Sequence, residues 1–98
     1  MIAQLRIYTV NKGKMEHWLE VFHSELTPLL HEHGIRVESA WVDEHEEQFI
    51  WIRSFHDRED LAAKEAAFYA SEWWDANRTK IRSMLARREI RTIAPAFD

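Results

Sequence analysis

Alternating hydrophobic and polar side chains predict the strands of this protein. Residues 2–10, 35–42 and 48–55 alternate and are rich in β-branched and aromatic side chains, which favours strands. The short charged segment 43–47 separates the last two, so we expect an antiparallel hairpin. Segment 89–93 is the fourth and shortest predicted strand.

Helical spacing of apolar side chains predicts a first helix after the first strand. The apolar stripe runs from Met15 to Leu30, and Gly34 is a typical helix terminator. Pro28 lies inside this stripe, which predicts a kink or an irregular last turn.

A second helical region follows the hairpin and is expected in two pieces. Asp57 with Asp60 predicts its start, and Ser71 before Glu72 predicts a new N-cap. The predicted apolar faces of the two pieces are Leu61, Glu65, Phe68 and Tyr69, then Trp74, Ile81 and Leu85.

The order of these elements, β-α-β-β-α-β, predicts one α+β domain over residues 1–98. We expect a ferredoxin-like antiparallel sheet with the helices on one face. The odd-numbered residues of the first strand, including Leu5 and Ile7, are expected beneath the helices. The other face would then carry Arg6, Tyr8, Trp51, Arg53 and Phe55.

Such an exposed aromatic face predicts a homodimer that buries it. The five Trp, five Phe and two Tyr point the same way, because aromatic residues enrich interfaces. The alternative exchanges the two faces and places Trp51 and Phe55 under the helices.

Composition and charge narrow the classes of function. The net charge of −4 argues against nucleic-acid binding. The chain has no cysteine, which excludes disulfide and thiolate–metal frameworks. No segment approaches the ~20 apolar residues that cross a membrane, and no long apolar stretch opens the chain. We therefore expect a cytoplasmic protein without a membrane partner.

Several short segments together resemble the NIPSNAP family of dimeric α/β-barrel proteins. The opening Leu5-Arg6-Ile7-Tyr8-Thr9 with Gly13-Lys14 resembles that family's start. Ser71-Glu72-Trp73, Lys80 and Arg82 resemble a later segment, and the ending around Pro95 and Phe97 resembles its common tail. The resemblance implies a ferredoxin-like fold and dimerisation, and it implies no particular reaction.

The candidate ligand-binding residues are Arg6, Tyr8, Glu38, Trp51 and Arg53. Aromatic walls with a few convergent polar groups are typical of small-molecule pockets. Two arginines can grip a carboxylate or phosphate bidentately. The alternative is an Arg–Glu network that fixes the register of a dimer.

His23 and Tyr8 are the candidate catalytic residues. His23 borders the first apolar stripe, five residues before Pro28, and Trp73 precedes Trp74. The His-to-Pro spacing and the paired Trp residues resemble those of rhamnose mutarotase. That resemblance implies general acid–base catalysis, for which a His side chain is suitable near neutral pH. The alternative is a partly exposed His at the edge of the core.

No metal or cofactor is predicted. His31 and His33 are two residues apart on a helix, so their side chains diverge. No glycine-rich phosphate loop or nucleophile motif is present in the sequence.

Three interpretations remain open. The first is a homodimer or higher homo-oligomer that binds a small organic molecule, either anionic or polyhydroxy, in a cleft between the sheet and the helices or the dimer partner. The second is a cofactor-independent enzyme of mutarotase, isomerase or monooxygenase type. The third is a non-catalytic homodimeric interaction module.

Overall fold

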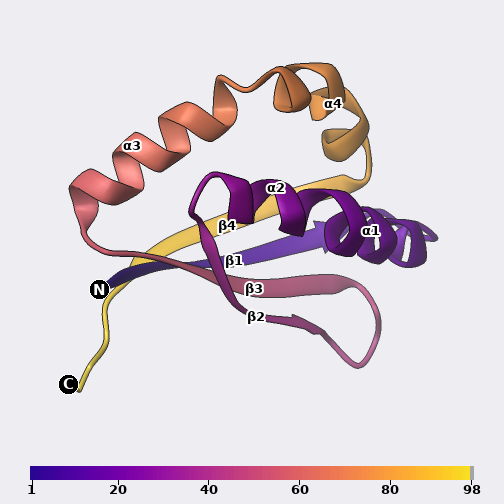
Figure 1. Cartoon of the computed structure of the whole chain (residues 1–98). Coiled ribbons are helices and arrows are strands. Elements are labelled where there is room, and N and C mark those ends of the chain that lie inside the picture. Colours follow the sequence, from indigo (N-terminus) through magenta and orange to yellow (C-terminus); the bar gives the residue numbers. More distant parts are fainter. Residues whose placement is uncertain (98) are drawn as a thin grey trace.

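A computed structural model describes residues 1–97 and shows one layer of helices on a four-stranded sheet (Figure 1). The strands are β1 (Ile2–Val10), β2 (Arg36–Val42), β3 (Gln48–Phe55) and β4 (Leu85–Ile93). The sheet order is β2-β3-β1-β4, and every neighbouring pair is antiparallel. This is the predicted ferredoxin-like arrangement.

The first helical region is a continuous rod made of three segments. It consists of α1 (Met15–Val21), a π-helical segment η1 (Phe22–Leu26) and α2 (Thr27–Glu32). The N–H of Thr27 donates to the carbonyl of Phe22, five residues earlier. Pro28 follows directly, where its missing N–H is tolerated at the start of α2. The predicted irregularity near Pro28 is therefore a π turn.

Local signals in the sequence set the other helix boundaries. The Asp57 carboxylate accepts the N–H of Asp60 and begins α3 (Arg58–Tyr69). The Ser71 hydroxyl accepts the N–H of Trp74 and begins α4 (Glu72–Ser83). Gly34 ends the first rod with φ of +71°, a conformation that glycine adopts without strain.

The last strand is longer than predicted. The sequence pattern predicts a start at Glu89 and places Leu85 on the preceding helix, whereas β4 begins at Leu85. Leu85 pairs with Val10 after a bulge that follows Thr9. Helical spacing from Ile81 to Leu85 was therefore misleading, because the chain leaves the helix at Ser83.

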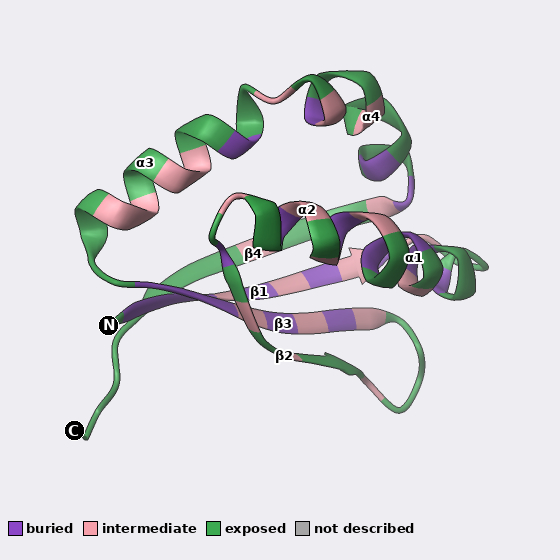
Figure 2. Cartoon of the chain, in the orientation of Figure 1, coloured by how far each residue is buried: buried purple, intermediate pink, exposed green. Residues whose placement is uncertain are grey.

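The helices cover the sheet face opposite to the one predicted. We call this covered face the inner face; it carries Gln4, Arg6, Tyr8, Phe49, Trp51 and Arg53, all buried. The outer face carries Leu5, Ile7, Ile50 and Ile52, which are only half-buried (Figure 2). The expectation that Trp51 and Phe55 lie on the face away from the helices is wrong. Both are core residues, 3% and 4% exposed.

Volume explains this choice of face. The helices contribute Trp18, Phe22, Phe68 and Trp74, all buried. Two of these rings pack against the large inner-face rings. Between ring centroids, Phe22 lies 4.6 Å from Phe49 and 5.0 Å from Trp51, and Trp18 lies 5.7 Å from Phe49. Bulky aromatic rings bury more area than aliphatic side chains do, so they favour the covered face.

Candidate functional site

Two arginines lie buried in the core between sheet and helices. Arg6 on β1 and Arg53 on β3 are each only 2% exposed. They lie on the inner face, where Arg6 is paired with Trp51 and Arg53 with Gln4 across the strands. Charged side chains are rarely buried this deeply without partners, so their partners define the site.

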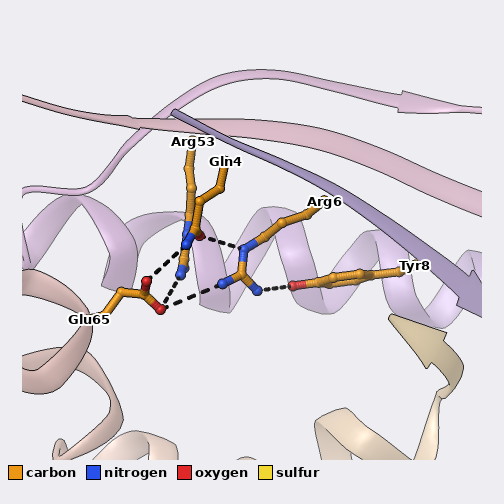
Figure 3. A network of polar contacts seen from close by, with 5 residues as sticks. All are labelled: Gln4, Arg6, Tyr8, Arg53 and Glu65. Atoms are coloured by element: carbon orange, nitrogen blue, oxygen red, sulfur yellow. Dashed lines mark hydrogen bonds and ion pairs between the residues drawn. The ribbon is translucent and has the colours of Figure 1, made fainter. Parts of the chain in front are cut away.

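A compact polar network joins the two guanidinium groups (Figure 3). The Gln4 side-chain oxygen accepts from Nε of both Arg6 (3.0 Å) and Arg53 (2.8 Å). Arg6 Nη1 donates to the Tyr8 hydroxyl at 2.8 Å. Gln4 in turn donates to Glu65 on α3 at 2.9 Å. Gln4 thus holds the two guanidinium groups side by side.

Glu65 is the carboxylate of this network. Its Oε2 lies 3.1 Å from Arg53 Nη2 and 3.7 Å from Arg6 Nη2. Its side chain is 23% exposed, so it enters the core from the rim. Two positive charges therefore share one negative charge within the described residues, which leaves a net charge of about +1 in a largely dry site.

The pKa values of the two arginines reflect this excess. Burial has the largest effect on Arg53 and lowers its pKa, and the charge of Arg6 lowers it further. Burial also acts to lower the pKa of Arg6, but Tyr8, Tyr69 and Glu65 outweigh it and the pKa is raised. A guanidinium keeps its proton in proteins, so both charges persist.

The two arginines border a small cavity of about 30 Å³. That is room for roughly two water molecules. Its wall is mostly aromatic and aliphatic, and three arginines complete it: Arg6, Arg53 and Arg88. The other lining residues are Tyr8, Trp18, Phe22, Leu26, Leu30, Trp51, Phe68, Tyr69, Trp74, Ile81 and Leu85. Within residues 1–97, the buried indole N–H groups of Trp18 and Trp51 have no acceptor. Two residues of the cavity wall therefore carry buried donors that no described residue satisfies.

The π turn helps to shape this wall. Trp18, Phe22, Leu26 and Leu30 are spaced by four residues and all line the cavity. In a regular α-helix such positions drift around the axis, because 3.6 residues make a turn. The extra residue taken up by η1 offsets that drift and keeps the four side chains in one row.

The structure brings together four of the predicted site residues and separates two. Arg6, Tyr8, Trp51 and Arg53 line the cavity, and both guanidinium groups stack on the Trp51 ring at 5.7 and 5.6 Å. Glu38 instead accepts from the Ser54 hydroxyl at 2.6 Å and pairs with Arg36. It does not contact the buried arginines, because it lies at a bulge in β2.

His23, predicted as a catalytic residue together with Tyr8, lies outside the cavity that Tyr8 lines. His23 is exposed and lines a separate surface groove with His31 and Trp41. The π turn points Phe22, rather than its neighbour, into the core. His33 does not join a metal site either, since its ring nitrogen pairs with the Leu29 carbonyl. In the described part of the chain, no three His, Asp or Glu side chains are grouped as metal ligands.

Sequence reasoning missed Gln4, Glu65 and Arg88 as members of the site. Glu65 had a signal: it interrupts an otherwise apolar helical face between Leu61 and Phe68. A carboxylate in such a stripe indicates a buried cationic partner. Gln4 carried no comparable signal.

Nearly the whole described chain matches one protein family. The model of the NIPSNAP family matches residues 3–97. The chain belongs to the NIPSNAP family. No curated protein is similar to it in sequence.

Solved structures show the same fold for this NIPSNAP protein. A NIPSNAP domain protein from Burkholderia xenovorans is 20% identical with a TM-score of 0.89, covering 98% of this chain and 95% of the other. A NIPSNAP family protein from Agrobacterium tumefaciens is 22% identical with a TM-score of 0.89, covering 98% and 88%. A putative antibiotic biosynthesis monooxygenase from Nitrosomonas europaea is 15% identical with a TM-score of 0.74, covering 99% and 100%. At these identities the likeness concerns the fold alone.

Proposed function

We propose that this NIPSNAP protein binds a small organic carboxylate, whose head group enters the cavity beside Arg6 and Arg53. One observation carries the proposal: two buried arginines share a single carboxylate. An added carboxylate would balance their remaining charge. It would also accept hydrogen bonds from unused guanidinium N–H groups, which suit a planar two-oxygen acceptor. The unpartnered indole N–H groups add further donors.

The test uses hexanoate and its uncharged counterpart hexanamide as probes. We expect hexanoate, but not hexanamide, to move the indole N–H resonances of Trp18 and Trp51 in NMR spectra. Arg53→Lys keeps the positive charge but loses the planar guanidinium that donates two parallel hydrogen bonds to a carboxylate. The affinity for hexanoate should therefore fall at least about tenfold. Arg58→Lys, an exposed arginine on α3, is the matched control and should bind as wild type does. Equal binding by both arginine variants would remove Arg53 from the site.

A cofactor-independent enzyme is the second candidate. It is favoured by the Tyr8 hydroxyl, which borders the cavity and accepts a hydrogen bond from Arg6. Because this hydroxyl borders the cavity, it is placed to exchange a proton with a bound ligand. His23 has no part in this version. Turnover of a bound carboxylate that is abolished in Tyr8→Phe would distinguish catalysis from binding.

We further infer a homodimer through the outer face of the sheet. The outer face presents half-buried Leu5, Ile7, Ile50 and Ile52, and nearby Trp41 is 64% exposed. An apolar surface of this kind usually marks an interaction site, and a two-fold axis would bury it against its own copy. The proposed interface therefore uses aliphatic residues. It does not include Trp51 or Phe55, which the sequence pattern had placed on the dimer face.

Ile50→Lys should abolish this dimer, because it places a charge in the centre of the outer face. Sedimentation velocity at micromolar concentration should show a dimer for wild type and a monomer for the variant. Ala63→Lys, on the exposed side of α3, should remain dimeric. A monomeric wild type would contradict the proposal.

No helix of the described residues is long and apolar enough to cross a membrane. The cytoplasmic location stays a prediction from the sequence.

A further inference from the structure

The buried cavity is too small for a whole organic ligand. Its volume of about 30 Å³ admits a carboxylate head group, which replaces roughly two waters. The rest of any bound molecule must therefore leave through the mouth of the cavity. Where that mouth lies decides what the rest of the ligand contacts.

The mouth lies beside β4 and the end of α3. Tyr69 and Arg88 are the exposed members of the cavity lining, and Leu85 is half-buried. Arg88 is paired with Tyr8 across β1 and β4, so it points to the inner face as Tyr8 does. A ligand leaving the cavity passes this third arginine.

A surface groove continues from the mouth. This groove, of about 380 Å³, is lined by Arg82, Leu85, Ala86, Arg87, Arg88 and Ile90. Leu85 and Arg88 line both the groove and the cavity, so the two spaces meet at these residues. We call it the β4 groove. Its apolar part suits a hydrocarbon body, and its arginines suit a second negative charge.

The arginines of the β4 groove are free to bind an anion. Within residues 1–97, Arg82, Arg87 and Arg88 have no carboxylate within ion-pair distance, whereas Arg78 and Arg91 do. Cationic side chains on an edge strand commonly serve to prevent strand pairing. That role cannot explain Arg82, which belongs to α4. Its guanidinium lies 5.9 Å from the ring centroid of Trp74, a residue of the cavity wall.

We propose that the ligand is an elongated organic dianion. One carboxylate enters the buried cavity at Arg6 and Arg53, and the second anionic group rests in the β4 groove at Arg82 and Arg88. The hydrocarbon between them passes Leu85. This proposal rests on the proposed carboxylate binding and adds to it the length and the second charge of the ligand.

The experiment compares dicarboxylates with monocarboxylates of equal length by calorimetry. The pairs run from butyrate and succinate through hexanoate and adipate to octanoate and suberate. We expect one dicarboxylate to bind at least about tenfold tighter than its monocarboxylate partner, because it gains an ion pair at the groove. The length at which this advantage appears measures the distance from the cavity to the groove.

The double variant Arg82→Gln/Arg88→Gln should remove this advantage. It should bring the dicarboxylate to the affinity of its monocarboxylate partner. The single variant Arg82→Gln leaves the cavity lining intact; it should reduce the advantage of the dicarboxylate and leave the monocarboxylate within about twofold of wild type. Arg58→Gln is the control and should change neither. If monocarboxylates bind at Arg53 but no dicarboxylate binds tighter, the dianion proposal is overturned and carboxylate binding stands. If no carboxylate binds, both proposals fall.

Discussion

Phe22→Ala is expected to lower the free energy of unfolding by about 3–5 kcal/mol. Phe22 is 6% exposed and lies where the π segment meets the inner face of the sheet. Its ring centroid is 4.6 Å from that of Phe49, 5.0 Å from that of Trp51 and 5.9 Å from that of Trp18. Truncation removes the contacts to these three rings and leaves a cavity. The closely packed surroundings cannot collapse to fill it. Chemical denaturation of the two proteins measures the difference.

His23→Ala provides the matched control for this substitution. His23 is the next residue in the same π segment, yet its side chain is exposed. Its loss should change the free energy of unfolding by less than about 0.5 kcal/mol. A loss below about 1 kcal/mol in Phe22→Ala would show that the helix packs through another face. The pair therefore tests the register of the π turn as well as the core.

The element order was predictable because each boundary has its own local cause. Asp57 and Ser71 accept backbone N–H groups at the starts of α3 and α4, and Gly34 adopts the positive φ that ends the first rod. These are short-range effects that the sequence reports directly. Alternation likewise located β1 and β3, since each has one buried and one less buried side, and β2, where half-buried and exposed positions alternate up to Ala40.

The covered face was not predictable from alternation, which separates two faces but does not rank them. Gln4, Arg6 and Arg53 argued for solvent on the inner face, while the aliphatic outer face looked like a core. The polar inner-face residues are satisfied by a helix far away in the sequence: Gln4 on β1 donates to Glu65, 61 residues later. Long-range compensation of this kind leaves only a weak trace in sequence, here one carboxylate in the apolar stripe of α3.

The candidate site was predictable where it follows from strand alternation and not where the chain is irregular. Residues two apart on a strand share a face, so Arg6 and Tyr8 had to meet, and β3 beside β1 added Trp51 and Arg53. The prediction that Glu38 lies in the site was wrong because a bulge between Val37 and Ser39 shifts the register of β2 there. The prediction that His23 is a catalytic residue of the site was wrong because the π turn changes the side of the helix on which each residue lies. Neither irregularity has a reliable signal in a single sequence.

Glu65→Gln is expected to lower the free energy of unfolding by about 3 kcal/mol. The substitution keeps the shape of the side chain but removes the carboxylate that contacts Arg53 and Arg6. Breaking a buried ion pair from one side typically costs about 3–5 kcal/mol, because the remaining charge stays unpaired. The lower end applies here, since the Glu65 side chain is 23% exposed and water reaches it.

The same variant also tests the proposed ligand. With Glu65 neutral, two unbalanced guanidinium groups remain, and hexanoate should raise the melting temperature of Glu65→Gln more than that of wild type. Glu20→Gln is the control: this carboxylate is exposed on α1, and its loss should change the free energy of unfolding by less than about 0.5 kcal/mol. A Glu65→Gln protein as stable as the control would mean that water alone satisfies Arg6 and Arg53. The buried charge would then provide no driving force for binding a carboxylate.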